Sequence, residues 1–259
     1  MDLGLGGRTA IVAASSRGLG KAVAVALARE GANVVMFSRD QAAIDASARE
    51  AGERAVGLAA DATSQRDLER VVQTAVDRFG AVDIVYNNAG GPKPGLFDTL
   101  SDNDWQSAFE LNLMSAIRLT RLCLPHMKSR KWGRVITGTS SSVKQPLPTL
   151  MLSNSVRSAT TAWSKTLADQ VAADGITVNT VAPGRINTER LRQIDADIAE
   201  RSGRSQEEVE RDALKTVPMG RYGDPSEFGA VVAFLASEAA SYVTGVTLLV
   251  DGGLFRGTY

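Results

Sequence analysis

The chain has 259 residues, with 29 Lys plus Arg and 29 Asp plus Glu, so its formal net charge at pH 7 is zero. No net field favours nucleic acid or an anionic membrane surface, and we exclude both as partners. Cys123 and His126 are the only cysteine and histidine, which excludes a disulfide within the chain and a cysteine or multi-histidine metal site. No segment reaches the roughly 20 apolar residues of a membrane span. We therefore expect a cytoplasmic protein that forms one domain over residues 1–259.

Short apolar runs alternate with longer amphipathic patterns along the chain. The predicted strands cover residues 8–14, 33–37, 54–60, 82–87, 133–139, 175–182 and 246–253. The helices predicted between them cover 19–31, 41–52, 65–80, 102–128, 150–167 and a segment after residue 224. Continuous apolar strands between amphipathic helices indicate a parallel sheet that is covered on both faces. The sequence therefore predicts an α/β fold, a doubly wound Rossmann-like parallel sheet of about seven strands whose ligands bind outside the carboxyl ends of the strands.

A charged segment at about 188–217 interrupts this alternation directly after a predicted strand. Ser205 followed by Glu208 is a helix-capping pattern, as is Ser101 followed by Asp104 at the start of the long helix. The segment therefore predicts a helical hairpin. Its place after the carboxyl end of a strand favours a substrate lid, and the alternative is a solvated hairpin with no function.

The first predicted strand runs into the turn AASSRGLGKA. Gly18 and Gly20 would let the backbone approach a pyrophosphate, and the following helix would aim its N-terminal amides at the negative charge. The predicted phosphate-binding residues of this turn are Ala14, Ser16, Arg17, Gly18, Leu19 and Gly20. The context of strand, turn and helix predicts a dinucleotide site.

The end of the second strand, MFSRD, bears on the choice of dinucleotide. NAD binders usually place an acid near this point, whereas a cation accommodates the extra phosphate of NADP. Ser38 and Arg39, together with Arg17, would form an anion pocket for that phosphate. Asp40 lies past the strand end and is expected to cap the next helix. The sequence therefore favours NADP(H) over NAD(H). The alternative, that the two arginines are ordinary surface residues, would not explain why the acid typical of NAD binders is missing at the strand end.

Four further motifs are specific in combination: NNAG at 87–90, FELNLMSAIRLT at 109–120, ITVNTVAPGRINT at 176–188 and VTGVTLLVDGG at 243–253. With them, the chain from about residue 6 to residue 253 resembles the short-chain dehydrogenases/reductases, in particular the 3-oxoacyl-carrier-protein reductase-like branch. The resemblance implies that the cofactor-binding residues also include Asp61, Ala62, Asn88, Ala89, Gly90, Pro183, Gly184, Ile186 and Thr188.

The family resemblance also implies an active site with four roles. A tyrosine exchanges the proton, a lysine four residues later lowers the tyrosine's pKa and holds the nicotinamide ribose, a serine fixes the substrate oxygen and an asparagine supports a water relay. Counting from the flanking motifs places Ser140 and Asn112 at the serine and asparagine positions. It also places Ser153 at the tyrosine position and Arg157 at the lysine position. The resemblance therefore implies an atypical active site.

These two replacements change the proton chemistry. A serine hydroxyl is a far weaker acid than a tyrosine, whose unperturbed pKa is about 10. Arginine side chains normally titrate above about 12, so Arg157 is not expected to shuttle protons, although its guanidinium can bind ribose hydroxyls or a carboxylate. Lys144 is the best replacement acid if desolvation lowers its pKa, and its alternative is a surface lysine. Tyr86 next to NNAG is expected to be a core aromatic, and Tyr222 could approach from beyond the lid.

A second departure from the family lies in the phosphate loop. The family's first glycine and the threonine before it are replaced by Ala14 and Ala13. A methyl group at the tight turn could narrow the approach to the cofactor. We expect cofactor binding to persist because Gly18, Gly20 and the helix N-terminus remain.

The leading hypothesis is an NADP-dependent oxidoreductase that moves hydride between the nicotinamide and a carbonyl or alcohol carbon of a small-molecule substrate. Ser140 would polarise the oxygen, Lys144 or a water held by Asn112 would handle the proton, and Arg157 would hold the ribose or an acidic substrate group. The main alternative is a catalytically inactive dinucleotide-binding sensor, or the partner subunit of an active homologue. A third hypothesis is that a protein with this fold catalyses an elimination or isomerisation, which needs no strong acid at position 153.

The family assembles as dimers and tetramers through two long helices, which here cover residues 102–128 and 152–173. Small residues on the second of these helices would let a partner helix approach closely: Ser155, Ser158, Ala159 and Ala162. The resemblance therefore implies a homotetramer or homodimer. The alternative is that the same small residues pack on the sheet of their own subunit.

Overall fold

The computed structural model describes residues 2–258 of the chain. Within these residues, seven parallel strands form one sheet in the order β3-β2-β1-β4-β5-β6-β7. The strands are β1 (Thr9–Ala13), β2 (Asn33–Ser38), β3 (Ala55–Ala59), β4 (Ile84–Asn87), β5 (Gly133–Gly138), β6 (Ile176–Pro183) and β7 (Thr247–Val250). The predicted doubly wound α/β fold is confirmed, and every predicted strand is present.

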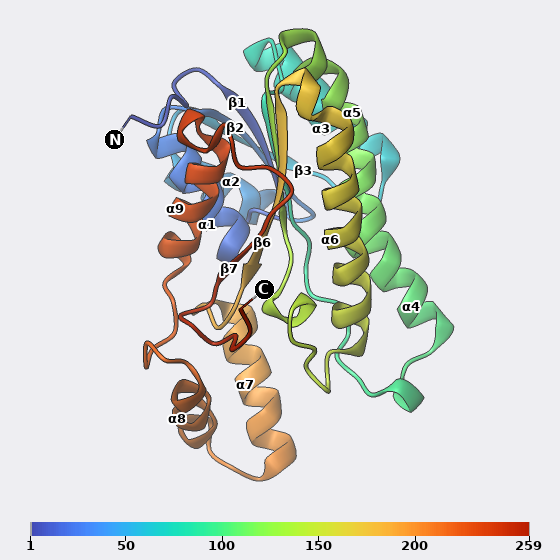
Figure 1. Ribbon diagram of the computed structural model, residues 1–259, viewed down its shortest axis with the longest axis vertical. Helices are drawn as coiled ribbons and strands as arrows, with labels where there is room; N and C mark the ends of the chain where they lie inside the picture. Colours follow the sequence, from blue (N-terminus) through green and yellow to red (C-terminus); the bar gives the residue numbers. More distant parts are fainter. Residues whose placement is uncertain (1, 259) are drawn as a thin grey trace.

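Nine α-helices connect and cover the strands within the described part of the chain. They are α1 (Gly18–Arg29), α2 (Gln41–Ala51), α3 (Gln65–Phe79), α4 (Asp102–Phe109), α5 (Ser115–Arg130), α6 (Met151–Val171), α7 (Glu189–Ser202), α8 (Gln206–Thr216) and α9 (Pro225–Ala236). Figure 1 shows α1, α2 and α9 on one face of the sheet and α3, α5 and α6 on the other. A separate apolar core fills each interface, because the strands are apolar on both faces.

The strand order reverses between β1 and β4, since β1 pairs with β2 on one side and with β4 on the other. The connections after these two strands run to opposite faces of the sheet, which opens a crevice at their carboxyl ends. The functional site is therefore expected where the loops after β1 and β4 diverge.

The predicted helix 102–128 is interrupted in the structure. A π-helical turn, Glu110–Met114, separates α4 from α5, and α5 continues to Arg130. The extra residue of such a turn shifts the helical register without changing which residues are apolar, so the apolar pattern could not predict it. This turn carries Asn112.

The capping residues predicted from the sequence are confirmed. The side chain of Ser101 accepts a hydrogen bond from the amide of Asp104, and Ser205 accepts one from Glu208. Asp40 caps α2 by accepting from the amide of Ala43. Each cap satisfies a backbone donor that the first helical turn would leave unpaired.

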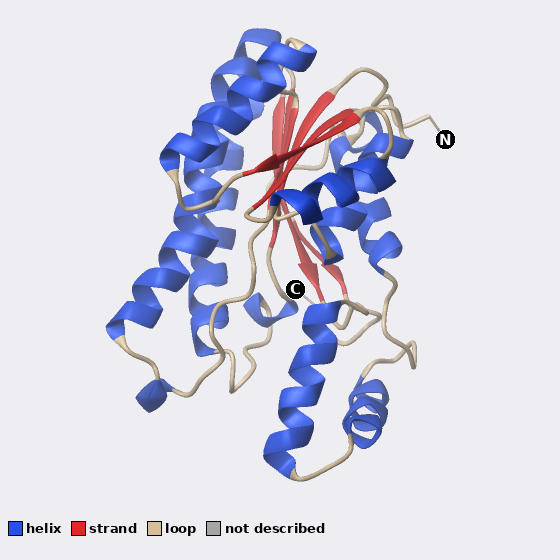
Figure 2. Cartoon of the chain, turned by 180° about the vertical axis from the view of Figure 1, so that it is seen from behind, coloured by secondary structure: helices blue, strands red, loops and turns tan. Residues whose placement is uncertain are grey.

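The charged segment at 188–217 forms the predicted helical hairpin, made of α7 and α8. Figures 1 and 2 show this hairpin extending past the carboxyl ends of the strands, clear of the helices that cover the sheet. Among residues 2–258, no helix combines the length and the apolar character that crossing a membrane requires.

Candidate active site

The turn after β1 has the shape of a phosphate cradle. Ala14 adopts a left-handed conformation with φ of 49°, and Gly18 has φ of 58°. A Cβ on Gly20 would lie 2.3 Å from the carbonyl oxygen of Ala14, so only glycine fits at this contact. Arg17 makes no side-chain cap at the start of α1, and the first helical turn carries no acidic residue. The backbone amides of this turn can therefore donate hydrogen bonds to a bound anion. Ser16 and Leu19 are half-buried in the same turn.

The loop after β4 is tied to this turn. The side-chain nitrogen of Asn88 donates to the carbonyl oxygens of Ala13 and Ala14, at 3.4 and 3.5 Å. The carbonyl of Ala89 accepts a hydrogen bond from Arg157, and Gly90 is exposed beyond it. The NNAG motif thus holds the two sides of the crevice at a fixed separation.

Each of the residues predicted to bind the NADP phosphate has its own contacts in the structure. The hydroxyl of Ser38 donates to the carbonyl of Asp40 at 3.3 Å, and Arg39 is exposed. Arg17 instead forms an ion pair with Glu189 of α7, at 2.8 Å. An exposed pair of this kind contributes little stability, so Arg17 can exchange Glu189 for a phosphate at small cost.

Asp61 and Ala62 follow β3 on the same edge of the sheet. The carboxylate of Asp61 accepts from the amide and the hydroxyl of Thr63, at 2.8 and 2.7 Å. Its amide donates to Asp67 at 2.9 Å. The side chain of Asp61 therefore shapes the turn after β3.

The segment after β6 crosses from the sheet to the phosphate turn. Pro183 ends β6, and Gly184 packs so closely on Asp251 that a Cβ at Gly184 would lie 2.6 Å from the Cβ of Asp251. Ile186 is buried. Thr188 caps α7, and its methyl carbon lies 3.8 Å from the place that a Cβ on Gly18 would occupy. The base of the hairpin therefore adjoins the phosphate turn.

Ser140 follows β5 with its hydroxyl free to donate. Its oxygen accepts from the amide of Ser142 at 3.1 Å, which leaves the proton available for a substrate oxygen. Asn112 is 5% exposed on the π turn, and its backbone carbonyl accepts from the hydroxyl of Thr160 at 3.2 Å. Both polar atoms of the Asn112 side chain are buried without a partner among the described residues. A water or ligand atom at this place would satisfy them.

Ser153 and Arg157 lie one turn apart on α6, and both are buried. The guanidinium of Arg157 donates to the carbonyl of Gly138 at 3.0 Å and to that of Ala89 at 3.4 Å. Burial lowers the pKa of Arg157 to about 10, against a smaller opposite effect of Tyr86. Arg157 therefore remains a cation at neutral pH.

The structure does not give the other candidate acids the surroundings that they would need. Lys144 is exposed, so the desolvation on which its role as an acid depends is missing. Tyr86 is buried in β4, and burial raises the pKa of its hydroxyl, as a core aromatic would show. Tyr222 donates to the carboxylate of Asp195 at 2.8 Å, and burial together with this bond raises its pKa to about 12. Tyr86 and Tyr222 would therefore release a proton poorly at neutral pH.

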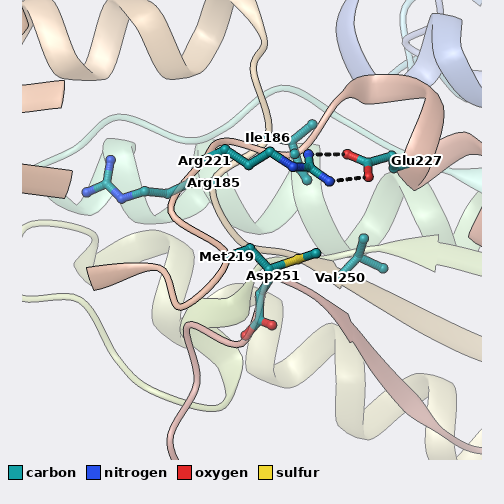
Figure 3. A pocket seen from close by; sticks show the side chains of 9 residues that line it. Arg185, Ile186, Met219, Arg221, Glu227, Val250 and Asp251 are labelled. Carbon is teal, nitrogen blue, oxygen red and sulfur yellow. Dashed lines mark hydrogen bonds and ion pairs between the residues drawn. The ribbon is translucent and has the colours of Figure 1, made fainter. Parts of the chain in front are cut away.

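One group of polar residues at the base of the hairpin was not anticipated from the sequence. Asp195, buried on α7, pairs with Arg185 at 3.2 Å as well as with Tyr222. Beside them lies a cavity of about 80 Å³, on whose wall Arg221 and Glu227 form two hydrogen bonds of 2.7 Å (Figure 3). The charged sequence pattern of the hairpin suggested solvated side chains, so it gave no sign that Asp195 is buried.

Comparisons with known proteins agree with this geometry. A family model described as enoyl-(acyl carrier protein) reductase matches residues 13–255. The 3-oxoacyl-[acyl-carrier-protein] reductase FabG of Vibrio cholerae is 35% identical over 258 residues, which cover 98% of this chain and 99% of that protein. The FabG of Escherichia coli is 36% identical over 254 residues, covering 96% and 98%.

Solved structures give the same result. The L-sorbose reductase of Gluconobacter frateurii, crystallised with NADPH and L-sorbose, superposes with a TM-score of 0.94 at 32% identity, covering 99% of this chain and all of that one. The chain belongs to the short-chain dehydrogenase/reductase family of oxidoreductase enzymes.

Proposed function

We propose that this protein reduces a carbonyl group of a small molecule with NADPH, and that it also catalyses the reverse oxidation. The contact between Gly20 and the Ala14 carbonyl carries the proposal, because a turn this tight at an uncapped helix N-terminus suits a pyrophosphate. The NADPH complex of the sorbose reductase supports the choice of cofactor. When bound, the nicotinamide would supply the hydride.

The chain's own residues would position the carbonyl and handle the proton. Ser140 would donate a hydrogen bond to the carbonyl oxygen, since its own oxygen is already occupied by the amide of Ser142. A water held by the unpartnered amide of Asn112 would deliver the proton. This route is favoured over Lys144, because Lys144 is exposed, and over Ser153, because a serine hydroxyl is too weak an acid.

The finer features of the assembly are also proposed. We treat 1–259 as one domain with the α7–α8 hairpin as its lid, because the ion pair between Arg17 and Glu189 joins the hairpin to the phosphate turn. A homotetramer or homodimer is supported by Ser155, Ser158 and Ala159, which are exposed on α6 rather than packed on the sheet. A cytosolic location is supported by the single cysteine.

The inactive sensor remains a second candidate, and the buried Ser153 favours it, because that position holds no proton donor of useful acidity. The two functions differ in turnover. The sensor would bind NADPH without oxidising it in the presence of any carbonyl compound.

A titration tests the proposed function first. NADPH and then NADH are added to the full chain, and the fluorescence of Trp105, Trp132 and Trp163 is followed, with calorimetry as the second method. We expect NADPH to bind more tightly than NADH, and Arg39→Gln to weaken NADPH alone. The matched control Arg49→Gln, on an exposed part of α2, should change neither affinity. Failure of both cofactors to bind at tens of micromolar would remove the oxidoreductase function.

A further inference from the structure

The buried cation at the centre of the site has no opposite charge. Arg157 is 8% exposed, and its two hydrogen bonds end on neutral carbonyl oxygens, those of Gly138 and Ala89. No carboxylate of the described residues lies within ion-pair distance of its guanidinium. A buried charge without a counter-charge is costly to the folded state, and a guanidinium with two of its five donors engaged can still bind further acceptors.

Some polar groups near Arg157 also lack hydrogen-bond partners among the described residues. The side-chain amide of Asn112 and the hydroxyl of Ser142 are buried without partners among residues 2–258. Asn112 is joined to α6 through Thr160, less than one turn from Arg157, and the 3-10 turn of Ser142 packs on α6 as well. Ser153 lies one turn before Arg157 on the same face of α6, and its side chain is much smaller than a tyrosine. Buried polar groups without partners indicate a site that a polar ligand completes.

Two further cations lie around this site without a paired carboxylate in the described structure. Two guanidinium nitrogens of Arg190, on α7, lie 3.5 Å from the place that a Cβ on Gly91 would occupy. Arg190 therefore covers the same loop whose Ala89 carbonyl holds Arg157. Lys144 follows Ser140 by four residues and is exposed after β5. Two cations without a paired carboxylate in the described structure thus lie beside the site, although the whole chain is neutral.

Two carboxylates at the base of the hairpin are paired with other residues. Glu189 pairs with Arg17 at 2.8 Å, and Asp195 pairs with Arg185 at 3.2 Å while also accepting from Tyr222. Neither carboxylate pairs with Arg157 in the described structure, so its guanidinium is open to a carboxylate that comes with a ligand.

We propose that the substrate is an oxo acid, whose carboxylate pairs with Arg157 while its carbonyl accepts from Ser140. This inference rests on the proposed function, since it assigns the substrate class of the same site. A planar carboxylate with one charge matches the fork of a single guanidinium. A phosphate dianion would need more than the one buried cation that Arg157 provides. Arg190 and Lys144 attract the acid from the rim.

Binding of matched acids and amides tests this proposal without depending on turnover. The probes are 2-oxobutanoate, acetoacetate and 4-oxopentanoate, each compared by calorimetry with its own amide, which has the same shape and no charge. We expect at least one acid to bind about tenfold or more tightly than its amide, as a bidentate charged pair provides. The result that overturns the proposal is that no acid binds more tightly than its amide.

Single substitutions test which residues produce the preference for an acid over its amide. Arg157→Met should remove the preference, so that the acid and its amide bind equally tightly. Arg157→Lys should retain part of the preference for the acid. Arg190→Gln and Lys144→Gln should each weaken the acid by roughly two- to fivefold, as expected of exposed charges. Arg201→Gln, an exposed arginine near the far end of α7, should change nothing. A ratio that survives Arg157→Met contradicts the proposal, and if that variant does not fold, unchanged ratios in both Arg157→Lys and Arg190→Gln contradict it.

The same titrations separate this inference from the proposed function. Each is run on the full chain with and without saturating NADP⁺. If the protein does not bind NADP⁺ but still binds an acid more tightly than its amide, the proposed reductase function is contradicted and the carboxylate site is retained. If the protein binds NADP⁺ but binds no acid more tightly than its amide, the proposed reductase function is retained and the oxo acid is rejected as the substrate class.

Discussion

At the scale of single residues, Ala14 is the clearest case of a local conformation that its residue type does not favour. Its φ of 49° places an alanine in the left-handed region, where a Cβ crowds the following carbonyl oxygen. The close contact of Gly20 with the Ala14 carbonyl and the bonds from Asn88 hold it there. The strain is therefore imposed by the surrounding loop and persists only while that loop is formed.

Replacing this residue should relieve the strain. We expect Ala14→Gly to raise the free energy of unfolding by about 1 kcal/mol, because glycine adopts positive φ without the Cβ clash. The same change removes the methyl group beside the phosphate cradle, so NADPH should bind more tightly. Urea unfolding and the fluorescence titration measure the two effects.

The neighbouring alanine provides the control for this prediction. Ala13 is buried in β1 and has an ordinary strand conformation, so Ala13→Gly should destabilise the protein, by about 1 kcal/mol. Opposite signs for two adjacent alanines would show that the backbone conformation decides the outcome. Equal destabilisation by both changes would show that Ala14 is not strained.

Arg157 and Ser153 lie one turn apart on the buried face of α6, beside the loops after β4 and β5. We propose that they stand at the lysine and tyrosine positions of the family. On that proposal the site would hold a cation that does not titrate near neutral pH in place of a strong proton donor. The proposed function therefore takes the proton from a water instead.

At the scale of elements, the hairpin is held by a buried carboxylate rather than by a large apolar core. Asp195 on α7 is 2% exposed and depends on Tyr222 and Arg185 for its hydrogen bonds. Removing one donor leaves a buried acceptor unsatisfied, which costs more than the loss of a surface contact. These contacts therefore stabilise the base of the hairpin.

We expect Tyr222→Phe to loosen α7 without altering the sheet. A lost hydrogen bond to a buried carboxylate costs about 1–3 kcal/mol, which corresponds to roughly 5- to 150-fold faster amide exchange in α7. Hydrogen exchange read by mass spectrometry measures it. Tyr242→Phe is the control, because Tyr242 is fully exposed and its exchange pattern should match that of the unchanged protein. Unaltered protection of α7 in Tyr222→Phe would mean that Tyr222 does not hold the hairpin.

The elements differ in how far the sequence determines them. Strands and caps depend on local rules, such as apolar runs and a serine three residues before an acid, so Ser101 and Ser205 could be identified from the amino-acid pattern alone. The π turn at Asn112 adds one residue to a helix and leaves no local sign. The pairing of Arg17 with Glu189 joins residues 172 positions apart, and only the folded arrangement of the hairpin brings them together.

At the scale of the whole molecule, a net charge of zero coexists with three cations that have no carboxylate partner among the described residues. Lys and Arg balance Asp and Glu over the chain, yet Arg157, Arg190 and Lys144 gather near one edge of the sheet without paired carboxylates in the described structure. A composition count averages over this asymmetry. The choice of ligand is therefore a property of the fold, which decides which charges are neutralised within the chain.

The surface of α6 bears on assembly. Ser155, Ser158, Ala159 and Ala162 are all exposed and form one stripe at helical spacing. The alternative that they pack on their own sheet is wrong for the chain as described. Phe109 at the end of α4, which packs beside α6, is also 46% exposed, and a large apolar side chain in that place is typical of an interface.

An arginine on this stripe tests the proposed assembly through α6. Ala159 is exposed in the single chain and arginine has a high helix propensity, so Ala159→Arg leaves the subunit fold intact. It places a long charged side chain where a partner helix would approach, and we expect light scattering after size exclusion to show a smaller species than the unchanged protein. Ala46→Arg, on exposed α2, should leave the mass unchanged. If Ala159→Arg keeps the full assembly, the subunits meet through another surface, and the exposed stripe of α6 faces solvent in the assembled protein.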